Sequence, residues 1–168
     1  SGGGYSYSQY ALGAGGAGGG AIRLVVTNGA LRMDGTIRAA GGNGGQQGGF
    51  GFVTPGGGGS GGSIWLECGE FTGSGSLRTV GGNGGNGQQA GGVDVDKGGG
   101  GGGGGRIAVH YTNTLYSGTF SVAGGSKGGF LATNGAGGTI YVPAAATGWN
   151  PQLGGDHGGA DWIITNNI

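Results

Sequence analysis

The glycine tracts of this chain constrain its fold more than any other feature. Glycine occupies 55 of the 168 positions, about a third of the chain, whereas average proteins contain roughly 7%. A collagen triple helix would need a strict Gly-X-Y period and roughly 15–20% proline or hydroxyproline. The chain has only three prolines and no strict period of this kind. Collagen is therefore excluded.

A flexible glycine linker is the next alternative, because glycine loses more backbone entropy on ordering than any other residue. Disordered chains, however, are poor in aromatic and β-branched residues. This chain is 34% hydrophobic and contains three Trp, six Tyr and five Phe, which stand in short runs between the glycine tracts. The composition therefore favours an ordered fold.

The charges argue against nucleic acid and an anionic membrane as partners. Seven basic and seven acidic residues give a net charge of zero, and the basic residues are spread along the chain rather than clustered as nucleic-acid binding requires. No apolar stretch reaches the roughly 18 residues of a transmembrane helix. We therefore expect neither nucleic acid nor a membrane span. The low charge favours association between copies of the chain.

An internal repeat organises most of the sequence. Segments 21–45, 63–85 and 106–129 align without strain, and a fourth copy begins at Thr139. A row of isoleucines opens the four copies at spacings of 42, 43 and 33 residues: Ile22, Ile64, Ile107 and Ile140. A period of this length indicates stacked units that bury their faces against one another.

The repeat sets the predicted domain boundaries. A glycine-rich domain covers 13–142, with units at about 13–55, 56–97 and 98–138 and a partial fourth unit from 139. The segments 1–12 and 143–168 fit the pattern poorly and are interpreted as atypical ends.

Each unit begins with a strand pattern. Ile22, Leu24 and Val26 alternate with polar or smaller residues, which is typical of a strand with one buried face. The pair Asn28-Gly29 favours a tight hairpin before a second strand. Gly35, Gly75 and Gly118 precede that second strand in the three full units. The sequence predicts an all-β fold without α-helix, either a short β-solenoid or a β-sandwich.

The glycine tracts themselves allow two interpretations. Without Cβ atoms, they could pack as left-handed polyglycine II helices with three residues per turn beside the β core. They could instead be mobile loops that decorate this core. Their recurrence at the same point of every unit favours ordered packing.

The order GGSGGSI, GSGSL, GGNGG, GGGRIAV and GGTIYV over about 13–142 resembles the glycine-rich repeats of large secreted and surface proteins of environmental bacteria, and related plant glycine-rich proteins. This resemblance implies a stalk, adhesive or matrix segment outside the cell. It implies no catalytic residues and no cofactor.

No residues suggest enzymatic chemistry. His110 and His157 lie in different segments without a nucleophile motif, and His110 is expected on the outer face of a strand. Cys68 falls on the apolar face and is expected to be a buried, inert thiol. Glu67 and Glu70 do not indicate a glycosidase pair.

A metal site has only slight support. Asp94 and Asp96 are candidate calcium ligands, but the six to eight oxygen ligands that calcium takes are not apparent.

Contacts with other molecules are expected at two places. The atypical ends carry candidate inter-subunit residues, which could equally serve as terminal caps: Tyr5, Tyr7, Tyr10, Trp149, Trp162, Ile163 and Ile164. The final ADWIITNNI resembles a strand that pairs with its own sheet or, as we favour, with a neighbouring copy. The variable loops between units carry candidate binding residues: Gln46, Gln47, Phe50, Phe52, Gln88, Gln89, Lys97, Lys127 and Phe130.

Two functions follow from these features. The first is a structural module that self-associates into an extracellular filament, fibre or matrix layer. The second is an adhesin tip that presents its variable loops to a cell-surface glycan or protein. Ice binding would need a regular ladder of threonines, which Thr27, Thr72 and Thr112 do not form.

Overall fold

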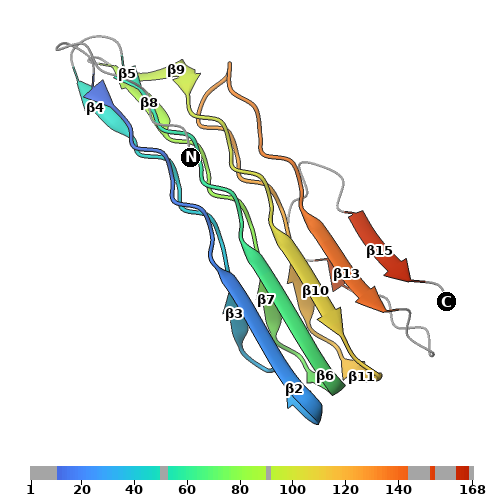
Figure 1. The fold of residues 1–168 in the computed structure, drawn as a ribbon. Coiled ribbons are helices and arrows are strands. Elements are labelled where there is room, and N and C mark those ends of the chain that lie inside the picture. The colour runs from blue at the N-terminus through green and yellow to red at the C-terminus, as the bar shows by residue number, and fades with distance from the viewer. Residues whose placement is uncertain (1–10, 50–52, 90–91, 144–151, 154–161, 167–168) are drawn as a thin grey trace.

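The computed structural model describes residues 11–49, 53–89, 92–143, 152–153 and 162–166 (Figure 1). These residues form strands and extended segments and include no helix, so the predicted all-β class is confirmed. None of the sheets closes on itself.

The larger sheet consists of parallel strands. In spatial order, β2 (Ala21–Arg32), β6 (Ser63–Gly73), β10 (Arg106–His110), β13 (Thr139–Pro143) and β15 (Trp162–Asn166) lie side by side, and β11 (Asn113–Tyr116) pairs with the later part of β6. The isoleucines that open the predicted units stand opposite one another in a single row across the sheet. Corresponding positions of the sequence are thus neighbours in space.

A smaller parallel sheet faces the first one. It contains β3 (Thr36–Arg38), β7 (Ser76–Arg78), β12 (Thr119–Ser121) and β14 (Gln152–Leu153). Three further short strands, β4 (Gln47–Gly49), β8 (Asn86–Gln89) and β9 (Gly92–Gly98), and the pair β1 (Ala11–Leu12) and β5 (Val53–Thr54) lie at the far end of the molecule (Figure 1).

The hydrophobic core lies between the two facing sheets. Its largest members are almost inaccessible to solvent, at 0–1% exposure: Ile64, Leu66, Phe71, Leu77, Ile107, Val109, Tyr116, Phe120, Ile140 and Val142. Alternate residues of β6 are buried, as the period-two pattern predicted. Burial of side chains of this size stabilises the fold by about 1.5–3 kcal/mol each.

Tyr116 anchors the core at the end where the chain turns from one sheet to the other. Its ring stacks on Phe71 with centroids 4.2 Å apart, and its hydroxyl donates a hydrogen bond of 2.7 Å to the carbonyl of Gly75. A side chain at Gly118 would overlap the Tyr116 ring. The glycine that recurs before each second strand therefore has a packing role in this unit.

The hairpin predicted at Asn28-Gly29 is wrong. β2 runs through these residues and stays parallel to β6, with a register shift between Val26 and Ala30. Asn28 does take the left-handed conformation that Asn-Gly turns use, with φ of 53°. Between the paired positions, β2 runs from Val26 to Ala30 while β6 runs only from Cys68 to Glu70. The extra residues of β2 form a bulge, because the segments on both sides of them pair with β6.

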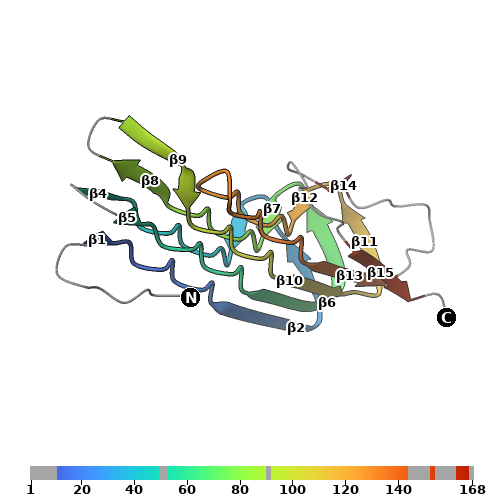
Figure 2. The same cartoon turned by 90° about the horizontal axis from the view of Figure 1, so that it is seen from above.

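The glycine tracts form extended segments that run side by side beyond the strands (Figure 2). We call these segments threads. In the described part of the chain they are 13–20, 39–45, 55–62, 79–85, 99–105, 122–128 and 133–138.

Backbone hydrogen bonds join the threads at every third residue. Gly16 and Gly19 donate to the carbonyls of Gly57 and Ser60, both at 2.8 Å, so that threads 13–20 and 55–62 run parallel. Gly59 donates at 2.8 Å to Gly42 of an antiparallel thread. An inner thread such as 55–62 therefore bonds to parallel neighbours and to threads of the opposite direction.

The third position of each turn points outward, and residues other than glycine occur there. In two threads this position is asparagine, and its side chain reaches the next thread: Asn43 Oδ1 accepts from the Asn83 N–H, and Asn83 Oδ1 accepts from the Ser126 N–H, both at 2.9 Å. Gly59 and Gly102 occupy inward positions of inner threads, where a methyl group would overlap the carbonyl oxygen of the adjacent thread.

We predict that Gly102→Ala destabilises the protein by about 3 kcal/mol or more, because the new methyl has to displace the backbone of thread 55–62. The matched control is Gly103→Ala, where the added carbon would lie 3.8 Å from the nearest atom. This variant should be neutral or more stable by about 0.4–1 kcal/mol. Urea unfolding followed by Trp fluorescence measures both. Equal effects of the two substitutions would contradict ordered thread packing.

Burial raises the pKa of Tyr116 to about 12. In the unfolded chain this phenol ionises near pH 10, so its contribution to stability is complete below pH 10 and is lost as the pH rises toward 12. We predict a late step in the phenolate absorbance titration of the native protein, which disappears in Tyr116→Phe. Persistence of that step in the variant would show that another tyrosine produces it.

Candidate functional surfaces

The described residues contain no group of three or more His, Cys, Asp and Glu side chains that could hold a metal ion. Glu67 and Glu70 are exposed on β6. Asp94 and Asp96 belong to β9, whose backbone pairs with β8, but their side chains lie outside what the structure describes. Calcium binding by these two residues remains a prediction.

Cys68 lies on the core side of β6, as the alternation predicted. It is 8% exposed and belongs to the cluster that includes Ile64 and Leu66. Desolvation raises the pKa of its thiol above the usual value, which lowers the fraction of reactive thiolate. The geometry fits an inert thiol rather than a nucleophile.

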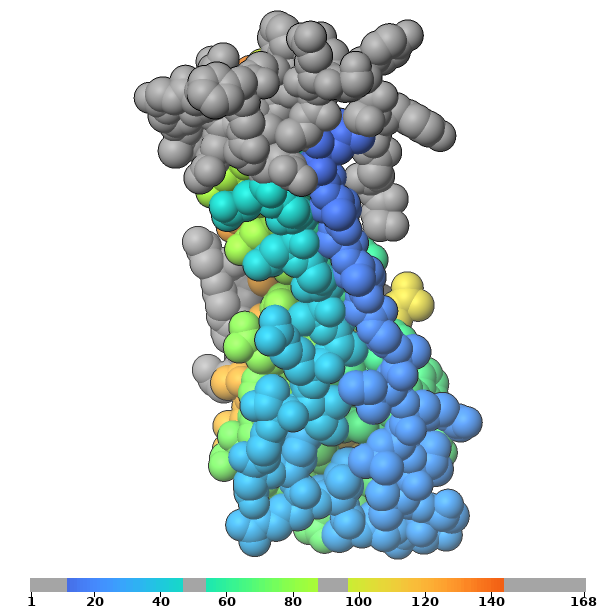
Figure 3. Space-filling view, turned by 90° about the vertical axis from the view of Figure 1, so that its left-hand side faces the viewer, coloured from blue at the N-terminus to red at the C-terminus, as the bar shows by residue number. Residues whose placement is uncertain are grey.

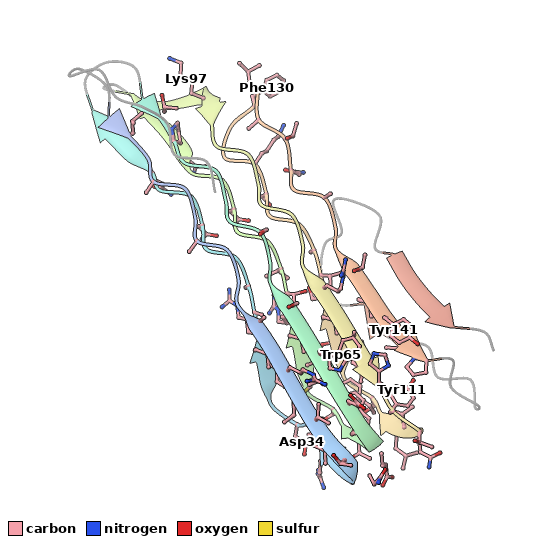
Figure 4. The ribbon with its side chains drawn as sticks, in the orientation of Figure 1. Asp34, Trp65, Lys97, Tyr111, Phe130 and Tyr141 are labelled. Atoms are coloured by element: carbon pink, nitrogen blue, oxygen red, sulfur yellow. The ribbon has the colours of Figure 1, made fainter. Side chains whose placement is uncertain are left out.

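An aromatic row on the outer face of the larger sheet was not predicted from the sequence (Figure 4). The His110 ring lies 4.2 Å from the Trp65 ring and 4.9 Å from the Tyr141 ring, measured between centroids. The row forms because Trp65 and Tyr141 both stand opposite Ala108, whose small side chain leaves room beside His110. The outer-face position predicted for His110 is confirmed.

A shallow recess lies where the strands change register. Its volume is about 310 Å³. Its walls come from the bulge of β2, from the middle of β6, and from the last residue of β10 with the segment that follows it: Val26, Thr27, Asn28, Glu67, Cys68, Gly69, His110, Tyr111 and Thr112. The Nε2 atom of His110 is buried and has no hydrogen-bond partner among the described residues. Among the described residues, the recess brings together polar groups from three neighbouring stretches of the chain but no recognisable catalytic pair.

Several predicted binding-loop residues lie at the end of the molecule opposite the register shift. Gln46 is exposed, and Phe130 is 73% exposed beside Leu131 at 77%. Lys127 Nζ lies 5.4 Å from the Phe130 ring centroid and donates a 3.2 Å hydrogen bond to the Phe130 carbonyl. Figure 4 places Lys97 and Phe130 near each other at this end.

The remaining loop residues lie in strands or outside the description. Gln47, Gln88 and Gln89 belong to the paired strands β4 and β8, and Lys97 belongs to β9. Phe50 and Phe52 lie outside the described residues, as do Tyr5, Tyr7, Tyr10, Trp149 and His157.

The terminal strand pairs with its own chain. β15, which carries Trp162, Ile163 and Ile164, lies parallel to β13 with Ile163 opposite Ile140. The alternative in which this strand pairs with its own sheet is thus realised on one of its edges, where β13 offers a matching register. The favoured pairing with a neighbouring copy stays a prediction for the other edge. The structure describes the backbone of these residues but not their side-chain contacts.

A surface ion pair lies where β2 ends, at the opposite end of the molecule from Lys127 and Phe130. Arg32 Nε lies 2.7 Å from Asp34 Oδ2, with both side chains exposed. The Asp34 carboxylate also accepts a 3.2 Å hydrogen bond from the Ser74 N–H. Arg32, followed by this backbone donor, lowers the pKa of Asp34. An exposed pair of this kind contributes little to stability.

We predict that Cys68 of the native protein reacts with thiol reagents far more slowly than it does after unfolding, because the thiol is buried and its pKa is raised. The measurement is the rate of labelling at mildly alkaline pH, with and without denaturant. Ser74→Cys, at an exposed position, provides a control for reagent access. Equal labelling rates at Cys68 in both states would contradict the burial.

In the ranges that the structure describes, no helix is long and apolar enough to cross a bilayer. Comparison with protein-family models, with curated proteins and with solved structures gives no match for this chain.

Proposed function

We propose that this protein is a structural module of glycine-rich repeats that self-associates into an extracellular filament, fibre or matrix layer. In this proposal the chain is a short β-solenoid built from units of about 42 residues. Each unit contributes one strand to each of the two facing sheets, together with two threads. The observation that carries the proposal is the register of the larger sheet, in which Ile22, Ile64 and Ile107 stand opposite one another.

The threads support this proposal through their hydrogen bonds. Bonds at every third residue are what a left-handed polyglycine II helix with three residues per turn would make with its neighbours. Each turn of an inner thread such as 55–62 donates two backbone bonds, for example from Gly58 to Gly100 and from Gly59 to Gly42, both at 2.8 Å. A bundle of backbones joined by hydrogen bonds in several directions is stiff, which suits a load-bearing element.

Two further features favour assembly over catalysis. The sheets are open, and open sheet edges invite pairing with another chain. Charged residues make up only 8% of the chain and the net charge is zero, so that long-range repulsion between copies is small.

Electron microscopy of the purified chain over a range of concentrations tests the proposal. We predict filaments, fibres or regular layers, with a repeat along the direction in which the units stack. Monodisperse monomers at high concentration, verified by analytical ultracentrifugation, would contradict it.

A second candidate function is an adhesin tip, which the grouping of variable segments at one end favours. The exposed pair Lys127 and Phe130 offers a cation and an aromatic face beside exposed Leu131, and residues of these types are common at binding sites. The ligand in this case would be a cell-surface glycan or protein.

Glycan-array binding tests the adhesin function. If it is correct, the joint substitution Lys127→Ala and Phe130→Ala abolishes binding, whereas Leu115→Ala, 78% exposed on β11, leaves it intact. No binding by the wild-type protein on glycan or cell-surface protein arrays would argue against this second function.

A further inference from the structure

In the part of the chain that the structure describes, β2 forms one edge of the larger sheet, and the core side of this edge is incompletely covered. Leu24 is 36% exposed, whereas Leu66, its partner on β6, is 0% exposed. Ile22 is half-buried, whereas Ile64 in the same row is 1% exposed. Figure 3 looks onto this edge, along which the residues of β2 and of thread 13–20 form a continuous strip. The apolar row of the core thus reaches the surface here.

The thread part of the same edge is blocked against another thread. In inner threads, Gly59 faces the carbonyl of Ala17 and Gly102 faces the carbonyl of Gly59, each so closely that a methyl group would overlap it. The residue equivalent to Gly59 in the first thread is Ala17, because β2 and β6 pair with an offset of 42 residues. Ala14 likewise occupies the position of Gly56. A further thread in the same register would collide with these two methyl groups.

The opposite edge of the sheet is formed by β15, which runs in the same direction as β2. Its register continues the rows of the sheet, with Ile163 in the isoleucine row and Ile164 in the row that contains Tyr141, Trp65 and Arg23. In the described residues neither outer edge has a strand partner. Two edges that share direction and register fit each other by translation of a second copy.

We propose that the joint between copies is a parallel pairing of β15 of one copy with β2 of the next, made by strands alone. The inference rests on the proposed self-association and specifies where it occurs. Ile163 of one copy then lies opposite Ile22 of the next, and Ile164 lies opposite Arg23. The methyl groups of Ala14 and Ala17 keep a neighbour's thread at a distance, so that the joint covers the strand region and leaves the thread layers separate. A head-to-tail contact of this kind does not close on itself and produces an open polymer.

Disulfide trapping tests the predicted register. Adjacent strands lie about 4.8 Å apart, within the Cα separations of roughly 4.4–6.8 Å that disulfides bridge. In a Cys68→Ala background, the pair Arg23→Cys and Ile164→Cys should give a ladder of covalent dimers, trimers and longer species on oxidation of the assembled protein. The pair Arg38→Cys and Ile164→Cys is the matched control, because Arg38 belongs to β3 of the other sheet, and should give no ladder.

The single-cysteine variants separate the alternative arrangements. Covalent dimers from Arg23→Cys alone would indicate that two β2 edges pair with each other, and would overturn the proposed joint. A double variant that remains monomeric in non-reducing gels although its polymers are visible by microscopy would also overturn it, while leaving the proposed function intact. An absence of polymers in the wild type would overturn both.

A charge at the joint provides an independent readout. Leu24→Lys should raise the protein concentration needed for assembly about tenfold or more, because the joint would bury an ammonium group. The fold should survive, since Leu24 is already 36% exposed. Leu115→Lys, at 78% exposure on β11, is the control and should assemble as the wild type does. Unchanged assembly of Leu24→Lys would show that this edge is covered in another way, for example by residues 1–10 of its own chain.

Discussion

Hydrogen bonds between the backbones of glycine threads are the interaction on which the rest of this structure depends. They recur at every third residue, as in the bonds from Gly16 to Gly57 and from Gly59 to Gly42. The close approach that they require leaves no room for a Cβ atom at the inward positions. Ordering a glycine costs more backbone entropy than ordering any other residue. The cost is offset here because a backbone without side chains can bond to neighbours on several sides at once.

The threads and the sheets determine each other's register. Thread 55–62 leads directly into β6 and thread 99–105 leads into β10, so that a slip of one thread by a residue would displace a whole strand. The core imposes the same register through side chains, because Ile64 and Ile107 have to meet in one row. Agreement between two independent sets of contacts is a property of sequences that specify a single fold. The outward asparagines add a third set of contacts, since Asn43 accepts a hydrogen bond from the backbone of thread 79–85 and Asn83 accepts one from the backbone of thread 122–128.

Much of this fold could be predicted from the sequence, because its signals are local and periodic. The alternation of Ile64, Leu66 and Cys68 indicated the buried face of β6, and the recurrence of Gly35, Gly75 and Gly118 marked the entry to each second strand. Asn28 and Gly29 misled the prediction, since their local turn preference is real but the parallel pairing with β6 converts it into a bulge. The aromatic row of Trp65, His110 and Tyr141 could not be predicted from any one segment. It depends on which strands become neighbours and on the small side chain of Ala108 between them. The candidate site residues in the ends of the chain that the structure does not describe stay predictions.

Hydrogen exchange of the thread amides, resolved by NMR, tests the account most directly. The amides of Gly59, Gly82 and Gly102 are bonded to neighbouring threads and should exchange only through unfolding of the whole domain. The amides of Gly57, Gly100 and Gly103 have no backbone acceptor among the described residues and should exchange rapidly. Alternation of slow and fast exchange with a period of three residues is the predicted result. Uniformly rapid exchange along the tracts would show that they are mobile loops and would contradict the account.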